Sequence, residues 1–263
     1  MGRAGIRGRN DRPLPIDIQD EDINTRLYEI FISWIYLHEQ AHLFQNHGII
    51  SPTISLHSNE ADLVWIDDAE TKTTEKITGN SASISHAYEL AADYEATTLL
   101  LQDLIKGDGG TLKKSTLWLL VFALACIFHR FHGPDRKPHD GVATGTHPDA
   151  SLRMTDSFRA INIFFEQPEV QTVVPWARDA STVASIVYSG FDVGVVFREV
   201  VHSDNPGLPE FKKKSQINDE SAQRYFLAID EVWKELRPKV ISNYFGKSRL
   251  HIRPFPYHRQ LGA

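Results

Sequence analysis

At 263 residues the chain is long enough to bury a full hydrophobic core, and its hydrophobic (41%) and charged (24%) fractions are those of a globular protein. The formal net charge of -6 argues against nucleic acid as the main partner. The single cysteine, Cys126, excludes an intrachain disulfide framework and suits a reducing compartment, so we expect a cytoplasmic protein.

The N-terminal residues 1–20 are rich in Gly, Arg and Pro and show no apolar period, so we predict a flexible arm and no secretory signal. From Asp22 to His47, apolar residues recur at helical spacing, which predicts a long helix containing the sequence LHEQAH. The segment 49–80 is rich in Ser, Thr and Asp and has only short apolar runs, so we expect a small β element there at most.

The rest of the chain repeats the helical pattern. Further helices are predicted at 83–106, 112–132, 148–165, 176–202 and 217–240. We expect Pro148 in the first turn of its helix, where proline is favourable. The apolar run 117–128 is shorter than the about 20 residues that a spanning helix needs, so no transmembrane segment is predicted. The result is a mainly α fold with a core at 21–165 and a helical C-terminal extension at 166–263, in the same domain or as a subdomain.

The sequence HEQAH has the spacing of a metal site. Residues four apart lie one above the other on a helix, so His38 and His42 can direct their imidazoles at one metal ion. Glu39 is turned about 100° away from His38, which suits it to take a proton from a water molecule instead of chelating. The alternative is a pair of core histidines that bind no metal.

A tetrahedral zinc site needs a third protein ligand. His47 follows His42 by five residues and does not fit the extended motif in which a third histidine completes the site. A better candidate is the sequence ELAAD, in which Glu89 and Asp93 share one helix face. Glu89 is predicted to ligate the metal, and Asp93 to accept the second ring N–H of a ligand histidine. The alternative is two solvated acids on a helix surface, although their small neighbours allow close helix packing.

A third motif, THPDASLR, occupies residues 146–153. His147 lies near the end of the long loop 133–149, at the mouth of a predicted helix, where it can hydrogen-bond the oxyanion of a tetrahedral intermediate. Arg153 can pair with an acid near the metal or anchor its own helix. Taken alone, the motif is only a loop histidine and a surface arginine.

Together, HEQAH, ELAAD and HPDASLR resemble the three-part signature of gluzincin metallopeptidases of the CAAX-processing and membrane heat-shock-protease type. That family carries His-Glu-x-x-His, then Glu-x-x-x-Asp, then His-Pro followed by Arg, and all three occur here in that order. The chain is also similar to soluble minigluzincins and to phage-exclusion Lit-type peptidases, which share the first motif in compact proteins. It departs from the first group because that group has transmembrane helices and none is predicted here.

The resemblance implies a compact zincin-like helical domain in which the HEQAH helix packs on the ELAAD helix. It also implies one bound Zn²⁺. The roles that it assigns are zinc ligands His38, His42 and Glu89, an outer partner Asp93, the general base Glu39, and transition-state support from His147 and Arg153.

We therefore expect a zinc-dependent endopeptidase that hydrolyses peptide bonds of an intracellular protein substrate. An intracellular protease must be restrained, so a regulatory partner, or a segment such as 133–149 or 49–80 that covers the cleft, is a further hypothesis. The alternative is a non-catalytic zinc-binding helical interaction module, a degenerate or latent protease, although structural zinc sites prefer Cys-rich shells. A helical interaction protein without metal is the third interpretation.

Overall fold

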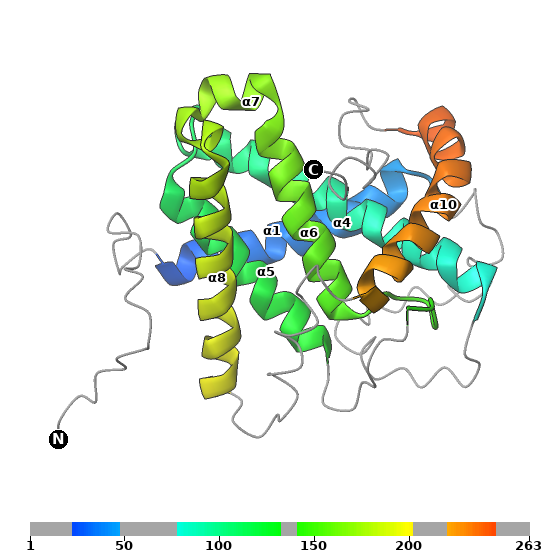
Figure 1. The fold of residues 1–263 in the computed structure, drawn as a ribbon. Helices are drawn as coiled ribbons and strands as arrows, with labels where there is room; N and C mark the ends of the chain where they lie inside the picture. The colour runs from blue at the N-terminus through cyan, green and yellow to red at the C-terminus, as the bar shows by residue number, and fades with distance from the viewer. Residues whose placement is uncertain (1–22, 48–77, 133–140, 202–219, 246–263) are drawn as a thin grey trace.

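The computed structural model describes residues 23–47, 78–132, 141–201 and 220–245, apart from the side chains of 132, 199 and 200. These residues are mostly helical (Figure 1). The helices are α1 (Ile23–Phe44), α4 (Asn80–Gly107), α5 (Lys114–His132), α6 (Ala150–Glu166), α7 (Pro168–Val173), the 3-10 helix η1 (Pro175–Arg178), α8 (Ala180–Val201) and α10 (Glu220–Asn243). The prediction of a mainly α fold is confirmed.

The small β element predicted at 49–80 lies almost wholly outside the described residues. At its end, Thr78 forms an isolated antiparallel bridge with Thr144. This bridge is the only extended pairing among the residues that the structure describes. It joins the start of α4 to the segment that leads into α6.

The predicted helix bounds agree with the observed ones to within about one helical turn, with two local corrections. The first helix ends at Phe44, before His47, because Asn46 adopts a left-handed backbone conformation (φ 55°) that interrupts an α-helix. Pro148 precedes the first turn of α6, because Asp149 is the N-cap and its carboxylate accepts a backbone N–H of that turn. The apolar pattern does not predict the short helices α7 and η1, each of which begins at a proline.

Helix α5 is the centre of the first hydrophobic core. Residues 115–129 are all buried, which suits a helix whose sequence is apolar on every side. Helices α8, α6 and α1 pack around it. The approach of α8 is close, because a Cβ atom added to Gly190 would lie 2.8 Å from the carbonyl oxygen of Trp118, and one added to Gly194 would lie 2.8 Å from Cβ of Ala125. Two glycines one turn apart therefore permit this helix contact.

Helix α4 contacts α1 and α10 and contributes to both hydrophobic cores. Residues 85–98 are all buried, and in the second core Leu90 of α4 clusters with Trp233 of α10. Figure 1 shows α4 crossing the molecule between α1 and α10. Because α4 is covered in this way, the acidic side chains in its middle need partners inside the protein.

In the part of the chain that the structure describes, two helices are long and apolar enough to cross a membrane, judged by length and composition alone. They are α5, over Lys114–Phe131, and α8, over Ala180–Arg198. The α5 window is 83% buried by the rest of the protein, as in the core helix of a globular protein, whereas the α8 window is 33% buried. The expectation of no transmembrane segment is based on the apolar run 117–128, which lies in α5, and it does not consider α8. The absence of a transmembrane segment therefore stays a prediction.

Candidate metal centre

The end of α1 and the middle of α4 bring three metal-ligating side chains together. His38 and His42 of α1 face Glu89 of α4. The Nε2 atoms of the two histidines lie 3.2 Å apart. Oε1 of Glu89 lies 3.3 Å from Nε2 of His42, and its Oε2 lies 3.6 Å from Nε2 of His38. These residues each offer a ligand atom within 4.8 Å of the others, so the group can hold a metal ion.

The spacing of these atoms fits a metal shell. Ligand atoms bound about 2.0–2.2 Å from one tetrahedral ion lie about 3.3–3.6 Å from one another. The three observed separations of 3.2, 3.3 and 3.6 Å are close to that range. In addition, Oε2 of Glu89 is buried and accepts no hydrogen bond from the described residues, and a buried carboxylate oxygen of this kind needs a partner. The residues present therefore fit a bound cation.

The charges in the group also suit a cation. Burial alone would raise the pKa of Glu89, but His147, His42 and His38 together hold it well below its usual range, so the carboxylate is ionised. Burial lowers the pKa of His38, yet Asp93 and Glu89 outweigh that effect and raise it to about 9. A metal ion bound to His38 would therefore displace a proton.

Asp93 and Arg153 support His38 from behind. Oδ1 of Asp93, which is fully buried, lies 2.9 Å from Nδ1 of His38. The Arg153 guanidinium binds the same carboxylate twice, donating from Nε to Oδ2 at 2.8 Å and from Nη2 to Oδ1 at 2.7 Å. Burial would raise the pKa of Asp93, but the charge and hydrogen bonds of Arg153, with the contact to His38, lower it. We call His38, Asp93 and Arg153 the His38 network.

The solvent-facing side of the group carries Glu39 and His147. Glu39 is exposed and follows His38 in α1, so it is turned about 100° from the ligand face. Nε2 of His147 lies 3.8 Å from Oε1 of Glu89, and the His147 side chain is 39% exposed. The side chain of His42 is 24% exposed, so solvent reaches the group from this side.

Four further residues near the group have no role predicted from the sequence. Nδ1 of His47, whose spacing does not fit a third metal ligand, lies 2.8 Å from Nδ1 of His42. His47 contacts Gln45, and further hydrogen bonds link Gln45 to Glu95 and Glu95 to Tyr244. Spacing cannot reveal these contacts, because Gln45 and Glu95 are 50 residues apart and Glu95 and Tyr244 are 149 apart. The one available signal is a third acidic residue, Glu95, which follows Glu89 and Asp93 in a largely apolar part of α4.

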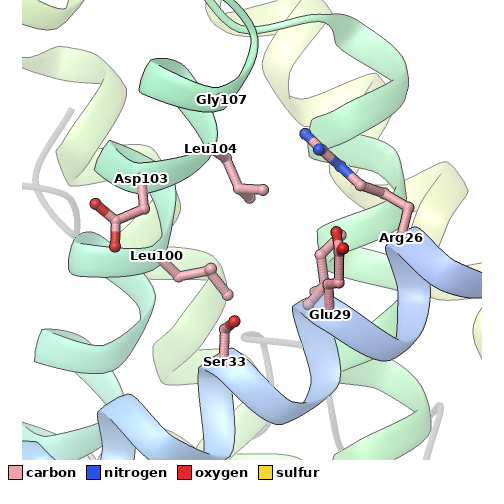
Figure 2. A pocket seen from close by; sticks show the side chains of 8 residues that line it. Arg26, Glu29, Ser33, Leu100, Asp103, Leu104 and Gly107 are labelled. Carbon is pink, nitrogen blue, oxygen red and sulfur yellow. The ribbon is translucent and has the colours of Figure 1, made fainter.

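A pocket at the other end of the α1–α4 contact is separate from this group (Figure 2). Its lining residues are Arg26, Glu29, Ile30, Ser33, Leu100, Asp103, Leu104 and Gly107. Arg26 donates a hydrogen bond from Nη2 to Oδ1 of Asp108 at 3.0 Å, so the cationic side chain of this lining is already paired. No residue of the metal group lines the pocket, and we assign it no part in the chemistry.

Comparison with known proteins identifies the family. A family model described as Peptidase U49 matches residues 11–172, more than half of the chain, and this range contains all three sequence motifs. No curated protein and no solved structure matches the chain. The match supports a peptidase, while the metal ion and the gluzincin type stay expectations from the residues. By this match, the chain belongs to the peptidase U49 family.

Proposed function

We propose that this peptidase is a zinc-dependent endopeptidase of gluzincin type that acts on an intracellular protein substrate in the cytoplasm. The observation that carries the proposal is the convergence of His38, His42 and Glu89, with the exposed carboxylate of Glu39 beside them. Membership of the peptidase family supports hydrolysis of a peptide bond. The donor set supports the metal.

Zinc is the cation that this donor set suits best. Catalytic zinc sites take three protein ligands, commonly imidazoles and a carboxylate, and keep one position open. Calcium and magnesium prefer shells made of oxygen atoms alone. A bound zinc ion supplies Lewis-acid chemistry, because it lowers the pKa of water and polarises a carbonyl oxygen.

Glu39 is the proposed general base. Its neighbours in sequence and space are the ligand histidines, but its side chain faces solvent, where an attacking water molecule and a peptide substrate can reach it. Glu39 accepts a proton from that water as it attacks the scissile carbonyl, and it then returns the proton to the leaving amine.

His147 and Arg153 receive different parts in the proposal. His147 is partly exposed on the open side, so its ring can donate a hydrogen bond to the oxyanion that develops on the substrate. Arg153 is 7% exposed and its guanidinium binds Asp93 through two hydrogen bonds. Of the roles expected for Arg153, we therefore assign pairing with an acid near the metal and not contact with the transition state.

The test combines metal content with cleavage. Full-length protein purified without chelators or a His-tag is expected to contain about one zinc per chain by elemental mass spectrometry. Cleavage of a proteome-derived peptide library is then followed by mass spectrometry for the wild type and for Glu39→Gln. We expect Glu39→Gln to keep its zinc and to lose at least about 100-fold in cleavage rate, because general base catalysis contributes about 10²–10⁴-fold.

The matched control is Glu29→Gln, which makes the same change at an exposed position on the same helix, far from the metal group. It is expected to cleave like the wild type. Undiminished cleavage by Glu39→Gln would refute the mechanism. Zinc without cleavage in the wild type would favour the non-catalytic binding module, and full zinc occupancy in Glu89→Ala would point to a different third ligand.

A further inference from the structure

The second ring nitrogen of His42 has a buried partner. Nε2 of His42 faces the other metal ligands, whereas Nδ1 lies 2.8 Å from Nδ1 of His47. Nε2 of His47 in turn lies 2.9 Å from Oε1 of Gln45. The His47 ring is buried and stacks on the ring of Tyr88, with centroids 4.2 Å apart. The partner of His42 is therefore itself fixed by packing.

Gln45 extends these contacts to α4 and to the end of α10. Its Nε2 donates to the carbonyl oxygen of Ala91 at 3.1 Å and to Oε2 of Glu95 at 2.7 Å. The other carboxylate oxygen of Glu95 accepts a hydrogen bond from the hydroxyl of Tyr244, directly after α10. We call this set the His42 network, and its members are His42, His47, Gln45, Glu95 and Tyr244.

One arrangement of protons satisfies the contacts of the His42 network with neutral rings. The amide nitrogen of Gln45 faces the carbonyl of Ala91, which can only accept, so the amide oxygen faces His47 and accepts. His47 then donates through Nε2, and a neutral ring that donates through one nitrogen accepts through the other. His42 therefore donates through Nδ1. That tautomer leaves Nε2 of His42 unprotonated, which is the form that binds a metal ion.

The C-terminal segment that supplies Tyr244 is held in place independently. The backbone N–H of Phe245 donates to the carbonyl oxygen of Phe44 at 2.8 Å. This carbonyl belongs to the last turn of α1, where carbonyl groups lack partners within the helix. Helix α10 also packs against α4 through the core around Trp233. The Tyr244 hydroxyl therefore reaches Glu95 from a segment that is anchored on both sides.

We propose that His47 and Gln45 are positioning residues that select the metal-binding tautomer of His42, and that Tyr244 completes their network from outside the family-matched residues. The inference rests on the proposed metal site. Metal-bound histidines donate their other ring N–H to outer groups, and these hydrogen bonds fix the ring orientation and raise metal affinity. His38 has such a partner in Asp93, and the His42 network is the corresponding support for the second histidine.

The experiment measures the zinc dissociation constant of the full chain by competition with a chromophoric chelator at fixed pH. His47→Leu, which removes both ring nitrogens, is expected to weaken zinc binding about 10–100-fold. His47→Asn keeps an acceptor for His42 close to the ring position of Nδ1, so it should recover part of that loss. The thermal unfolding of each metal-free variant is measured in parallel, because a purely structural role would lower stability without this ordering of affinities.

The far end of the network is tested with Tyr244→Phe, which deletes one hydroxyl. Its zinc affinity should fall about fivefold, the effect of losing one ordinary hydrogen bond. The matched control is Tyr188→Phe on α8, where the same deletion at an exposed tyrosine should leave zinc affinity unchanged. In the double variant of His47→Leu and Tyr244→Phe, affinity should equal that of His47→Leu alone, because the network is already interrupted.

The outcomes separate this inference from the proposed function. A wild type that binds no zinc overturns the metal site and the inference together. A wild type that binds zinc while His47→Leu and Tyr244→Phe bind it equally well overturns the inference alone. Multiplied losses in the double variant also overturn it, since they would show two independent effects. If His47→Leu does not fold, the affinities of His47→Asn and Tyr244→Phe decide.

Discussion

The two histidines of the metal group are supported in different ways. His38 is supported by a buried ion pair, in which Asp93 contacts the ring and Arg153 binds the carboxylate twice. His42 is supported by the ring of His47, which in turn contacts the uncharged side-chain amide of Gln45. A carboxyl group enters this network only beyond Gln45. One ligand is therefore oriented by charge, and the other by the order of donors and acceptors.

The two networks also differ in their reach along the chain. The His38 network joins α1, α4 and α6, which all lie within residues 11–172 of the family match. The His42 network joins α1 and α4 to Tyr244, well beyond residue 172. The matched residues therefore contain the proposed metal ligands and the whole of the His38 network, but the His42 network has its last member, Tyr244, beyond them.

The largest expected effect comes from breaking the charged support. Arg153→Met should lower the free energy of unfolding by about 3–5 kcal/mol, because it removes the guanidinium that binds the fully buried Asp93 twice and leaves only the His38 ring beside that carboxylate. Urea unfolding of the metal-free protein measures the change. Lys106→Met is the matched control, because it removes an exposed partner of Asp103, and it should cost less than about 1 kcal/mol.

A sharper version adds Asp93→Leu to Arg153→Met. Removing the second charge should restore part of the lost stability, since no unpaired buried charge remains. A cost for Arg153→Met as small as that for Lys106→Met would show that the charged support contributes nothing to stability. The claim that a buried ion pair supports His38 would then be wrong.

The second largest expected effect is the pH dependence of stability that arises from Glu95, the carboxyl group of the His42 network. Burial raises the pKa of Glu95 to about 7, although hydrogen bonds from Tyr244 and Gln45 lower it. A carboxyl group whose pKa is higher in the folded than in the unfolded state adds stability at low pH, and this is lost as pH rises through about 7. Glu95 should therefore lower the free energy of unfolding by up to about 3 kcal/mol between about pH 4.5 and 7.

Glu95→Gln should abolish that decline while keeping an oxygen that accepts from its neighbours. Urea unfolding at a series of pH values compares the variant with the wild type. Glu231→Gln makes the same substitution at an exposed position of α10, and its pH profile should match that of the wild type. Parallel profiles for Glu95→Gln and the wild type would mean that folding does not raise the pKa of this carboxyl group.

The smallest effect compares the two networks in one measurement. Asp93→Asn keeps an oxygen near His38 but removes the charge, and it should weaken zinc binding about 10–100-fold. The zinc dissociation constant is measured by the same chelator competition as for His47→Leu. Similar losses would mean that the charged and uncharged supports are equivalent for affinity. An unchanged zinc dissociation constant for Asp93→Asn would show that the charge of Asp93 does not contribute to zinc affinity.

The His38 side of the centre was largely predictable from the sequence, because its geometry is local. Residues four apart on a helix share a face, so spacing alone pairs His38 with His42 and Glu89 with Asp93. Helical periodicity likewise predicted most of the helices. It could not choose among the roles expected for Arg153, because that choice depends on how α6 packs against α4.

The His42 side could not be predicted, because it depends on contacts between distant segments. Gln45 and His47 follow the last regular turn of α1, on either side of Asn46, whose backbone is left-handed. Apolar periodicity does not predict that conformation. Glu95 and Tyr244 meet only when α10 docks on α4. Motif spacing tests His47 solely as a third metal ligand, so its position behind His42 emerges only from the fold.

The hydrophobic cores set a practical limit on dividing this chain. The first core includes Phe191 and Val195 of α8, and the second includes Tyr225 and Trp233 of α10, all beyond the end of the family match at 172. A fragment cut at that boundary would expose the apolar faces of α5 and α4 to water. The residues that the family model matches thus contain neither core completely, and we expect that a stable fragment of this peptidase must extend through α10.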